Sequence, residues 1–211
     1  MTKSMMKNEK ETEDRICSFS PLHVKMLDNR LRRFFLNPEK FLKSYVKPGM
    51  AVIDIGCGTG TFTHEMMKLS GAKGSVIACD VQEEMIEYAR KKLKGTDNFS
   101  RIKWHVCSSD SLNLGNESCF DFALSFFMVH EVPDMNSLFR EVFTLLKPGG
   151  IYLIAEPAFH VSKEAFSFTV NTAERCGFMT AEMKKISMGR MAVLKKPELL
   201  GDDSFLGEKF L

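Results

Sequence analysis

Short apolar runs alternate with amphipathic segments along most of the 211-residue chain. The apolar runs lie at residues 52–55, 76–79, 102–106, 120–127 and 151–155. Runs that are largely uninterrupted are typical of strands buried on both faces of a sheet, and 102–106 alternates as a strand with one exposed face does. Segments with apolar positions three or four residues apart lie at 61–69, 82–94, 135–146 and 162–176. This alternation predicts an α/β fold with a doubly wound, parallel sheet.

The C-terminal part of the pattern predicts two more strands. Residues 178–186 and 188–194 are both strand-like, and Gly189 near their junction favours a hairpin that adds one antiparallel strand. The full prediction is therefore a seven-stranded, mostly parallel sheet. The sequence KPGG at 147–150 is typical of a turn, and Asp134 and Ser162 are predicted helix N-caps.

One stretch, Val-Ile-Asp-Ile-Gly-Cys-Gly-Thr-Gly at 52–60, joins a predicted strand to a predicted helix. Its glycines permit a tight turn and let a ligand lie against bare backbone. The unpaired N–H groups at the start of the helix suit an anionic group. A second apolar run ends in Asp80, about 20 residues further on, where an acid that binds ribose hydroxyls is expected.

Four motifs in order and at matching spacing give a family resemblance: VIDIGCGTG, VIACD, FDFALSFFMVHEV and LLKPGGIYLIAEP. Residues 45–195 resemble class I S-adenosylmethionine-dependent methyltransferases of the small-molecule type, such as the quinone C-methyltransferases and arsenite methyltransferases. The resemblance implies a Rossmann-like fold, S-adenosylmethionine as cofactor and transfer of its methyl group to a small molecule.

The resemblance also assigns residues to the cofactor. The glycine loop would lie beneath the methionine moiety, Asp54 would orient the loop or the ligand's amino group, and Asp80 would hold the ribose hydroxyls. Val81 and Met85 would flank the adenine, and Phe126 would line the methionine end. The implied cofactor-binding residues of these regions are Asp54, Gly56, Cys57, Gly58, Gly60, Asp80, Val81, Met85 and Phe126.

The segment after the third strand departs from the family pattern. An acid that accepts from the adenine amino group is expected there, but Ser108 occupies that place, followed by Ser109 and then Asp110. Either a serine hydroxyl makes the contact or Asp110 reaches the adenine from a shifted loop. We therefore include all three residues among the cofactor-binding predictions.

Two residues after the fourth strand, His130 and Glu131, are the predicted catalytic residues. Methyl transfer from a sulfonium chiefly requires positioning, and a base is needed only if the acceptor must lose a proton. An imidazole titrates near neutral pH, so His130 is the best candidate base. The alternative, equally weighted, is that His130 only orients the turn into the next helix.

Composition narrows the class of acceptor. The net charge of +2 gives no electrostatic case for nucleic acid or an anionic membrane, and no apolar run reaches the about 18–20 residues that span a bilayer. The N-terminus lacks an apolar signal core, so we expect a cytoplasmic protein. Phe126, Phe127, Met128 and Phe159 suggest an apolar lining for a small acceptor. The sequence leaves the oligomeric state open.

Six cysteines raise an alternative acceptor, although none forms a C-x-x-C pair and no metal site is predicted. Cys57, Cys79 and Cys107 would end adjacent strands, either as small buried side chains or as a thiol cluster. A soft acceptor such as arsenite or a thiol, bound by Cys17 with Cys107, is thus one alternative function. A regulatory module that binds the cofactor without turnover is another.

Three regions complete the organisation. Residues 1–44 are predicted to be a polar tail followed by helices, 45–196 the methyltransferase domain, and 197–211 a tail. The N-terminal helices, one over about 20–35 and one starting at Pro38, either cover the cofactor cavity as a lid, as the resemblance implies, or pack on the sheet edge.

Overall fold

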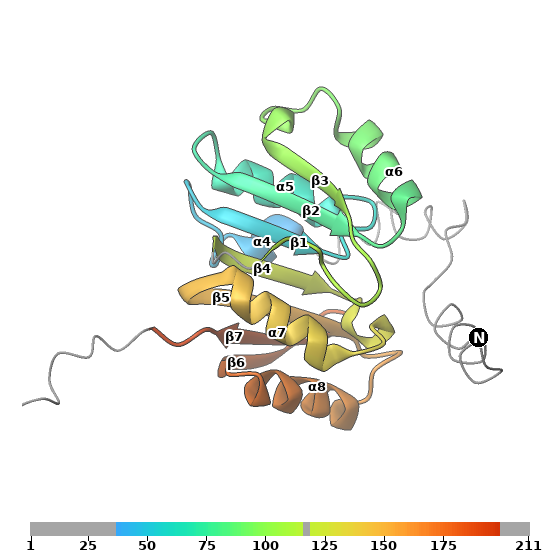
Figure 1. The fold of residues 1–211 in the computed structure, drawn as a ribbon, viewed down its shortest axis with the longest axis vertical. Helices are drawn as coiled ribbons and strands as arrows, with labels where there is room; N and C mark the ends of the chain where they lie inside the picture. Colours follow the sequence, from blue (N-terminus) through green and yellow to red (C-terminus); the bar gives the residue numbers. More distant parts are fainter. Residues whose placement is uncertain (1–36, 116–118, 199–211) are drawn as a thin grey trace, which may run out of the picture.

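The computed structural model describes residues 37–115 and 119–198, which form a seven-stranded sheet with the strand order β3-β2-β1-β4-β5-β7-β6 (Figure 1). The strands are β1 (Ala51–Ile55), β2 (Ser75–Asp80), β3 (Ile102–Val106), β4 (Phe120–Phe126), β5 (Leu146–Pro157), β6 (Met179–Ile186) and β7 (Gly189–Lys195). Only β7 runs antiparallel to its neighbours, and the other pairs are parallel. The predicted fold class is confirmed.

Helices cover both faces of this sheet, because alternate strand residues point to opposite sides. The helices are α4 (Pro38–Leu42), α5 (Thr61–Ser70), α6 (Glu83–Leu93), α7 (Met135–Leu145) and α8 (Lys163–Arg175), with 3₁₀ turns η1 (Phe99–Arg101) and η2 (Val129–Glu131). Val52 and Leu153 pack in the cluster that includes α4, α5 and α6, whereas Ile53 and Tyr152 pack in the cluster that includes α7 and α8. The sheet is therefore doubly wound.

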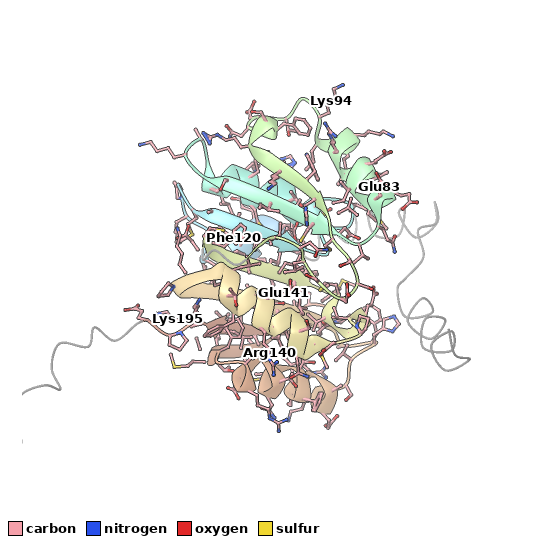
Figure 2. The ribbon with its side chains drawn as sticks, in the orientation of Figure 1. Glu83, Lys94, Phe120, Arg140, Glu141 and Lys195 are labelled. Carbon is pink, nitrogen blue, oxygen red and sulfur yellow. The ribbon has the colours of Figure 1, made fainter. Side chains whose placement is uncertain are left out.

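The helix ends follow the predicted capping chemistry. The Asp134 carboxylate accepts from the N–H groups of Asn136 and Ser137, and the Ser162 hydroxyl accepts from the N–H of Ala165. Helix α6 begins with Glu83 at its acidic first turn and is capped by Lys94 after a basic last turn, so its charges complement the helix dipole (Figure 2). Both predicted N-caps are confirmed.

The predicted turn at 147–150 is wrong, because these residues belong to the first half of β5. Gly149 has a φ of +77°, and its N–H donates to the carbonyl of Lys196. The N–H of Lys196 in turn donates to the carbonyl of Gly150. Hydrogen bonds to Lys196, the residue after β7, thus keep the glycines in the sheet. The residues of the predicted turn shift the register between β4 and β5.

The N-terminal helix that the structure describes, α4, packs on the sheet rather than standing away from it. Leu42 and Val46 are buried, and the Phe41 ring contacts Phe62 and Phe126 edge-on. The helix predicted over 20–35 and Cys17 lie outside the described residues, so the lid and the domain boundaries stay predictions. Within 37–115 and 119–198, no helix has the length and apolar character needed to cross a bilayer.

Candidate cofactor and acceptor site

A cavity opens at the carboxyl ends of β1, β2, β3 and β4. The strand order reverses between β1 and β4, which is the place where open α/β sheets bind ligands. Of the residues predicted from the sequence, those that line it are Asp54, Gly56, Cys57, Gly58, Asp80, Val81, Met85, Ser108, Ser109, Asp110, Phe126 and Glu131. Gly60 and His130 do not line it, and each has another place in the structure.

The glycine loop is held by the backbone of the next strand. The N–H groups of Gly56 and Cys57 both donate to the Cys79 carbonyl at 2.9 Å. Gly56 has a φ of +70°, and a Cβ there would lie 2.8 Å from Cγ of Met128. Gly60, with a φ of +71°, starts α5 and would bring a Cβ to 3.0 Å from Ala89. Gly60 therefore serves helix packing, and Gly56 lets the loop turn against Met128.

Asp80 joins the loop to the end of β2. Its Oδ2 accepts from the Gly58 N–H at 2.9 Å, and its Oδ1 accepts from the Gln82 N–H at 3.0 Å. Burial raises the pKa of this carboxyl, against the lowering effect of the backbone hydrogen bonds. The carboxylate lines the cavity, and each of its oxygens can accept more than one hydrogen bond, so it has capacity for a hydroxyl group that enters the cavity.

Asp54 lies deeper than Asp80, at the end of β1. The Thr63 hydroxyl of α5 donates to its Oδ2 at 2.5 Å, so the carboxyl links the strand to the first turns of that helix. Burial, with a smaller contribution from the charge of Asp80, raises the pKa of Asp54 to about 7. The acid is thus placed to change its charge near neutral pH.

The loop after β3 separates the two candidates for the adenine contact. The Ser108 hydroxyl donates to the Ser111 carbonyl at 3.1 Å and accepts from the Asn113 amide at 3.0 Å. Its donor and one of its two acceptor lone pairs are therefore used within the loop. The Asp110 side chain is exposed and lines the cavity, two residues from the place where the family pattern has its acid.

Aromatic and aliphatic side chains line the other end of the cavity. Phe126 at the end of β4 lies with its ring centroid 4.2 Å from those of Phe62 and Phe127. Phe127 has a φ of +61°, which is strained for a residue with a side chain. Met128 and Leu138 extend the apolar lining. The sequence indicated this lining at Phe126, Phe127 and Met128, whereas Phe159 is exposed and does not contribute to it.

His130 lies in η2 beside this apolar end and pairs with a buried acid. Its Nδ1 is 2.5 Å from Oε2 of Glu156, and its backbone N–H donates to Oε1 at 3.3 Å. Its Nε2 is 3.8 Å from Glu131, which lines the cavity, and the His160 ring stacks on it. Burial alone would lower the pKa of His130, but Glu156 and Glu131 outweigh it, so the pKa is raised.

Glu156 is the site residue to which sequence reasoning assigned no role. It is 1% exposed at the end of β5, and the preceding residue Ala155 pairs with Phe126 in β4. The available signal was its position at the carboxyl end of a predicted strand. The missing information was that β4 and β5 are neighbours, which brings Glu156 to His130.

The cysteines divide between the cavity and the core. Cys107 lines the cavity, whereas Cys79 is fully buried beside it. Over 37–115 and 119–198, no group of three or more His, Cys, Asp or Glu side chains is arranged to hold a metal ion. The predicted partner of Cys107 for a soft acceptor, Cys17, lies outside the described residues.

The side chains of this cavity fit S-adenosylmethionine by their chemistry. A bare glycine loop offers close backbone approach, and the Asp80 carboxylate lines the cavity as an acceptor for ribose hydroxyls. Val81 and Met85 offer apolar surface for a base. Asp54, with a pKa near 7, lies where a ligand's ammonium group would favour its ionised form.

Comparison with protein families matches residues 46–194 to a family described as a methyltransferase domain. Two similar curated proteins are the ubiquinone/menaquinone biosynthesis C-methyltransferase UbiE of Vibrio vulnificus (strain YJ016) and the demethylmenaquinone methyltransferase of Staphylococcus haemolyticus (strain JCSC1435). Each is 32% identical, over 131 and 126 residues, covering 59% and 58% of this chain. They are covered over 50% and 51% of their own lengths, so the chain spans about half the length of these relatives.

A solved structure agrees with these relatives. The crystal structure of a SAM dependent methyltransferase from Aquifex aeolicus has a TM-score of 0.76 and 25% sequence identity. It covers 85% of this chain and 100% of its own. The family match spans most of the chain, from four residues after α4 to the last-but-one residue of β7. The chain therefore belongs to the methyltransferase-domain family, and S-adenosylmethionine is the cofactor that this membership indicates.

Proposed function

We propose that the protein transfers a methyl group from S-adenosylmethionine to a small, apolar acceptor. The observation that carries the proposal is the cavity itself: a glycine loop tied to Asp80 at one end and an aromatic lining at the other. The polar end suits the cofactor and the apolar end suits a second ligand. A module that only binds the cofactor would not require the apolar end.

The residues at the cofactor end hold the cofactor in position and do not take part in the reaction. Asp80 accepts from the ribose hydroxyls, Val81 and Met85 contact the adenine, and Asp110 accepts from its amino group. Gly56 and Gly58 allow the methionine end to approach the backbone, with Asp54 fixing the loop through Thr63. The cofactor supplies an activated methyl group, so positioning accounts for most of the catalysis.

At the acceptor end, His130 acts as the general base. Nδ1 of His130 is held against the Glu156 carboxyl, so we assign the proton of the neutral imidazole to Nδ1, which leaves Nε2 as the basic atom. Glu131, 3.8 Å from Nε2, lies between the imidazole and the cavity. A proton leaving the acceptor would pass to Nε2, with Glu131 or water completing the path.

The acceptor carries an apolar ring system. The similar proteins of Vibrio and Staphylococcus are named for ubiquinone/menaquinone biosynthesis and for demethylmenaquinone. An aromatic ring packed on Phe127, with Met128 and Leu138 around it, is consistent with a ligand of that class. A soft acceptor such as arsenite is the second candidate, and Cys107 is the cavity thiol that would bind it.

Two measurements test the proposal. Isothermal titration calorimetry with S-adenosylmethionine should show binding to the wild-type protein and a loss of about 100-fold or more for Asp80→Ala, because hydrogen bonds to a charged group are lost. Asp97→Ala, an exposed acid outside the cavity, is the matched control and should bind as the wild type does.

Product analysis then separates the alternatives. Demethylated quinones, other phenolic acceptors and arsenite are incubated with protein and labelled cofactor. Methylated quinone or phenol supports the proposal, and methylated arsenic selects the soft acceptor. Cofactor binding without product across the panel indicates a non-catalytic module, and absence of cofactor binding rejects the methyltransferase function.

We also propose that the protein is cytoplasmic and that the N-terminal segment before α4, residues 1–36, covers the cavity as a lid. Cell fractionation tests the location. Deletion of residues 1–36 tests the lid. Turnover should fall, because the lid would close over the acceptor, whereas cofactor affinity should change by less than about threefold, because other residues bind the cofactor. Unchanged turnover after the deletion would contradict the lid.

A further inference from the structure

Two thiols lie side by side where the cofactor end of the cavity meets the core. Cys79 in β2 pairs in register with His105 in β3, so Cys107, two residues further along, points to the same face of the sheet. Cys107 packs against the core cluster that contains Cys79. The S–H of Cys79 donates to the Asp54 carbonyl oxygen at 3.5 Å, and the Cys107 thiol influences the pKa of Cys79.

The environments of the two thiols differ. Cys79 is fully buried, while Cys107 is partly exposed and lines the cavity. The neighbouring Cys79 thiol lowers the pKa of Cys107, against the opposing effects of burial and the charge of Asp80. The Cys107 thiol and burial raise the pKa of Cys79. An oxidant that enters the cavity therefore meets the more acidic thiol first, with a second thiol behind it.

The backbones of these cysteines hold the cofactor site. The Cys79 carbonyl accepts from the N–H groups of Gly56 and Cys57, which fixes the glycine loop. The Cys107 N–H donates to the Asp80 carbonyl at 3.0 Å, which connects it to the predicted ribose-binding acid. A covalent change at this pair therefore acts on both parts of the cofactor end.

We propose that Cys107 and Cys79 form an oxidative modification site: a hydroperoxide entering the cavity converts them to a disulfide, and the disulfide weakens cofactor binding. The second part rests on the proposed function, because it places the cofactor in this cavity. By linkage, bound cofactor favours the reduced pair to the same extent that oxidation weakens cofactor binding.

The chemistry balances with a hydroperoxide as the two-electron oxidant. The Cys107 thiolate attacks one peroxide oxygen, the O–O bond breaks, and protonation of the leaving oxygen releases water from hydrogen peroxide. The Cys79 sulfur then attacks the Cys107 sulfenic acid, the S–O bond breaks, and hydroxide takes up the Cys79 proton as a second water. Two thiols and one hydrogen peroxide thus become one disulfide and two waters.

Peptide mapping tests the modification itself. Trypsin leaves Cys107 and Cys119 together on residues 104–140, so the mapping uses a Cys119→Ser background, in which Cys79 lies on residues 74–90. Brief treatment with hydrogen peroxide should link these two peptides, and dithiothreitol should release them. The link should form about tenfold faster than oxidation of Cys176, because Cys107 lines the cavity and has a second thiol beside it that completes the reaction.

Variants make the mapping decisive. Cys79→Ser should stop the reaction at an oxidised Cys107 that is trapped by dimedone, and Cys107→Ser should abolish both products. Cys176→Ser is the control and should leave the link unchanged. Linkage of other cysteines, or a Cys107 no more reactive than Cys176, overturns the proposal.

Calorimetry tests the coupling to the cofactor. S-adenosylhomocysteine should bind the oxidised protein about tenfold more weakly than the reduced protein, a loss near 1.4 kcal/mol, with affinity restored by dithiothreitol. Equal affinities overturn the coupling but leave the mapped disulfide intact. If the reduced protein binds neither S-adenosylmethionine nor S-adenosylhomocysteine, the proposed function and the coupling both fail, and the peptide map still decides whether the thiols form the site.

Discussion

The two ends of the cavity are built by different means. At the cofactor end, main-chain N–H groups of Gly56, Cys57 and Gly58 are bound by the Cys79 carbonyl and the Asp80 carboxylate. At the acceptor end, a side chain of η2, His130, is bound by the buried side chain of Glu156. The first arrangement depends on backbone conformation, which a few glycines permit, and the second depends on which strands are neighbours.

The two ends also respond oppositely to charge. At the cofactor end, burial raises the pKa of Asp54 and Asp80 and so disfavours their ionised forms. A cationic ligand nearby would favour the ionised forms. At the acceptor end, Glu156 and Glu131 favour the positive charge of His130. Under the proposed function, the acids of the cofactor end therefore suit a cationic ligand, and His130 at the acceptor end is suited to accept a proton.

The largest effect is expected at His130. If His130 is the base, His130→Ala and His130→Asn should both lower kcat by about 100-fold or more, while cofactor affinity stays unchanged. Calorimetry and single-turnover kinetics measure the two quantities separately. Unchanged kcat would leave His130 as a residue that only orients the turn, and the acceptor end would then have no proton-accepting role.

A smaller effect is expected at the glycine loop. Gly56→Ala should weaken cofactor binding by about tenfold, because a Cβ would lie 2.8 Å from Met128 at a backbone angle that disfavours side chains. Gly71→Ala is the matched control, with a similar positive φ and no atom within 4 Å. It should lose stability to denaturant without losing affinity. Equal affinity losses in both variants would remove the special role of the loop's contact with Met128.

The Glu156–His130 pair predicts a shift in pH dependence. Glu156 raises the pKa of His130, so Glu156→Gln should lower it. The base is active when neutral, hence the acid limb of the kcat profile should move to lower pH, with kcat at its plateau reduced by about threefold as the imidazole becomes less basic. NMR titration of His130 gives an independent readout, and an unchanged imidazole pKa would contradict the role of Glu156.

The smallest effect is expected at Asp54, and it depends on pH. Its pKa is about 7 in the folded protein and 3.8 when exposed, so the stability it contributes is full below about pH 4 and is lost as pH rises through about 7. Asp54→Asn should therefore flatten the decline in urea stability between about pH 4 and pH 7. Cofactor affinity of the variant should match the wild type near pH 6, where Asp54 is mostly protonated, and fall below it at pH 8.

Parallel curves for wild type and Asp54→Asn would mean that Asp54 stays ionised across this range. The negative charge of Asp54 would then be present at every pH of this range, and the contrast in charge between the two ends would be sharper. Thr63→Val is the partner variant, since it removes the hydroxyl that lowers the pKa of Asp54 and should extend the decline to higher pH.

Local sequence alone predicted three features: the seven strands from the apolar pattern, the caps at Asp134 and Ser162 from residue type, and the strand-to-helix bend at Gly56 from the glycines. Each depends on neighbours within a few residues. The failure at 147–150 has the opposite cause. Turn residues are compatible with a strand when a distant segment, here Lys196, pairs with them.

The sequence by itself determined the order of elements, the backbone bend that suits a nucleoside cofactor and the acids at the ends of the first two strands. Only the tertiary structure decided that Glu156 meets His130, that Cys107 lies against Cys79, and that the Ser108 hydroxyl is used within its own loop. The reason is physical: side-chain pairs form between strands whose adjacency is set by packing of the whole sheet, which no local pattern specifies.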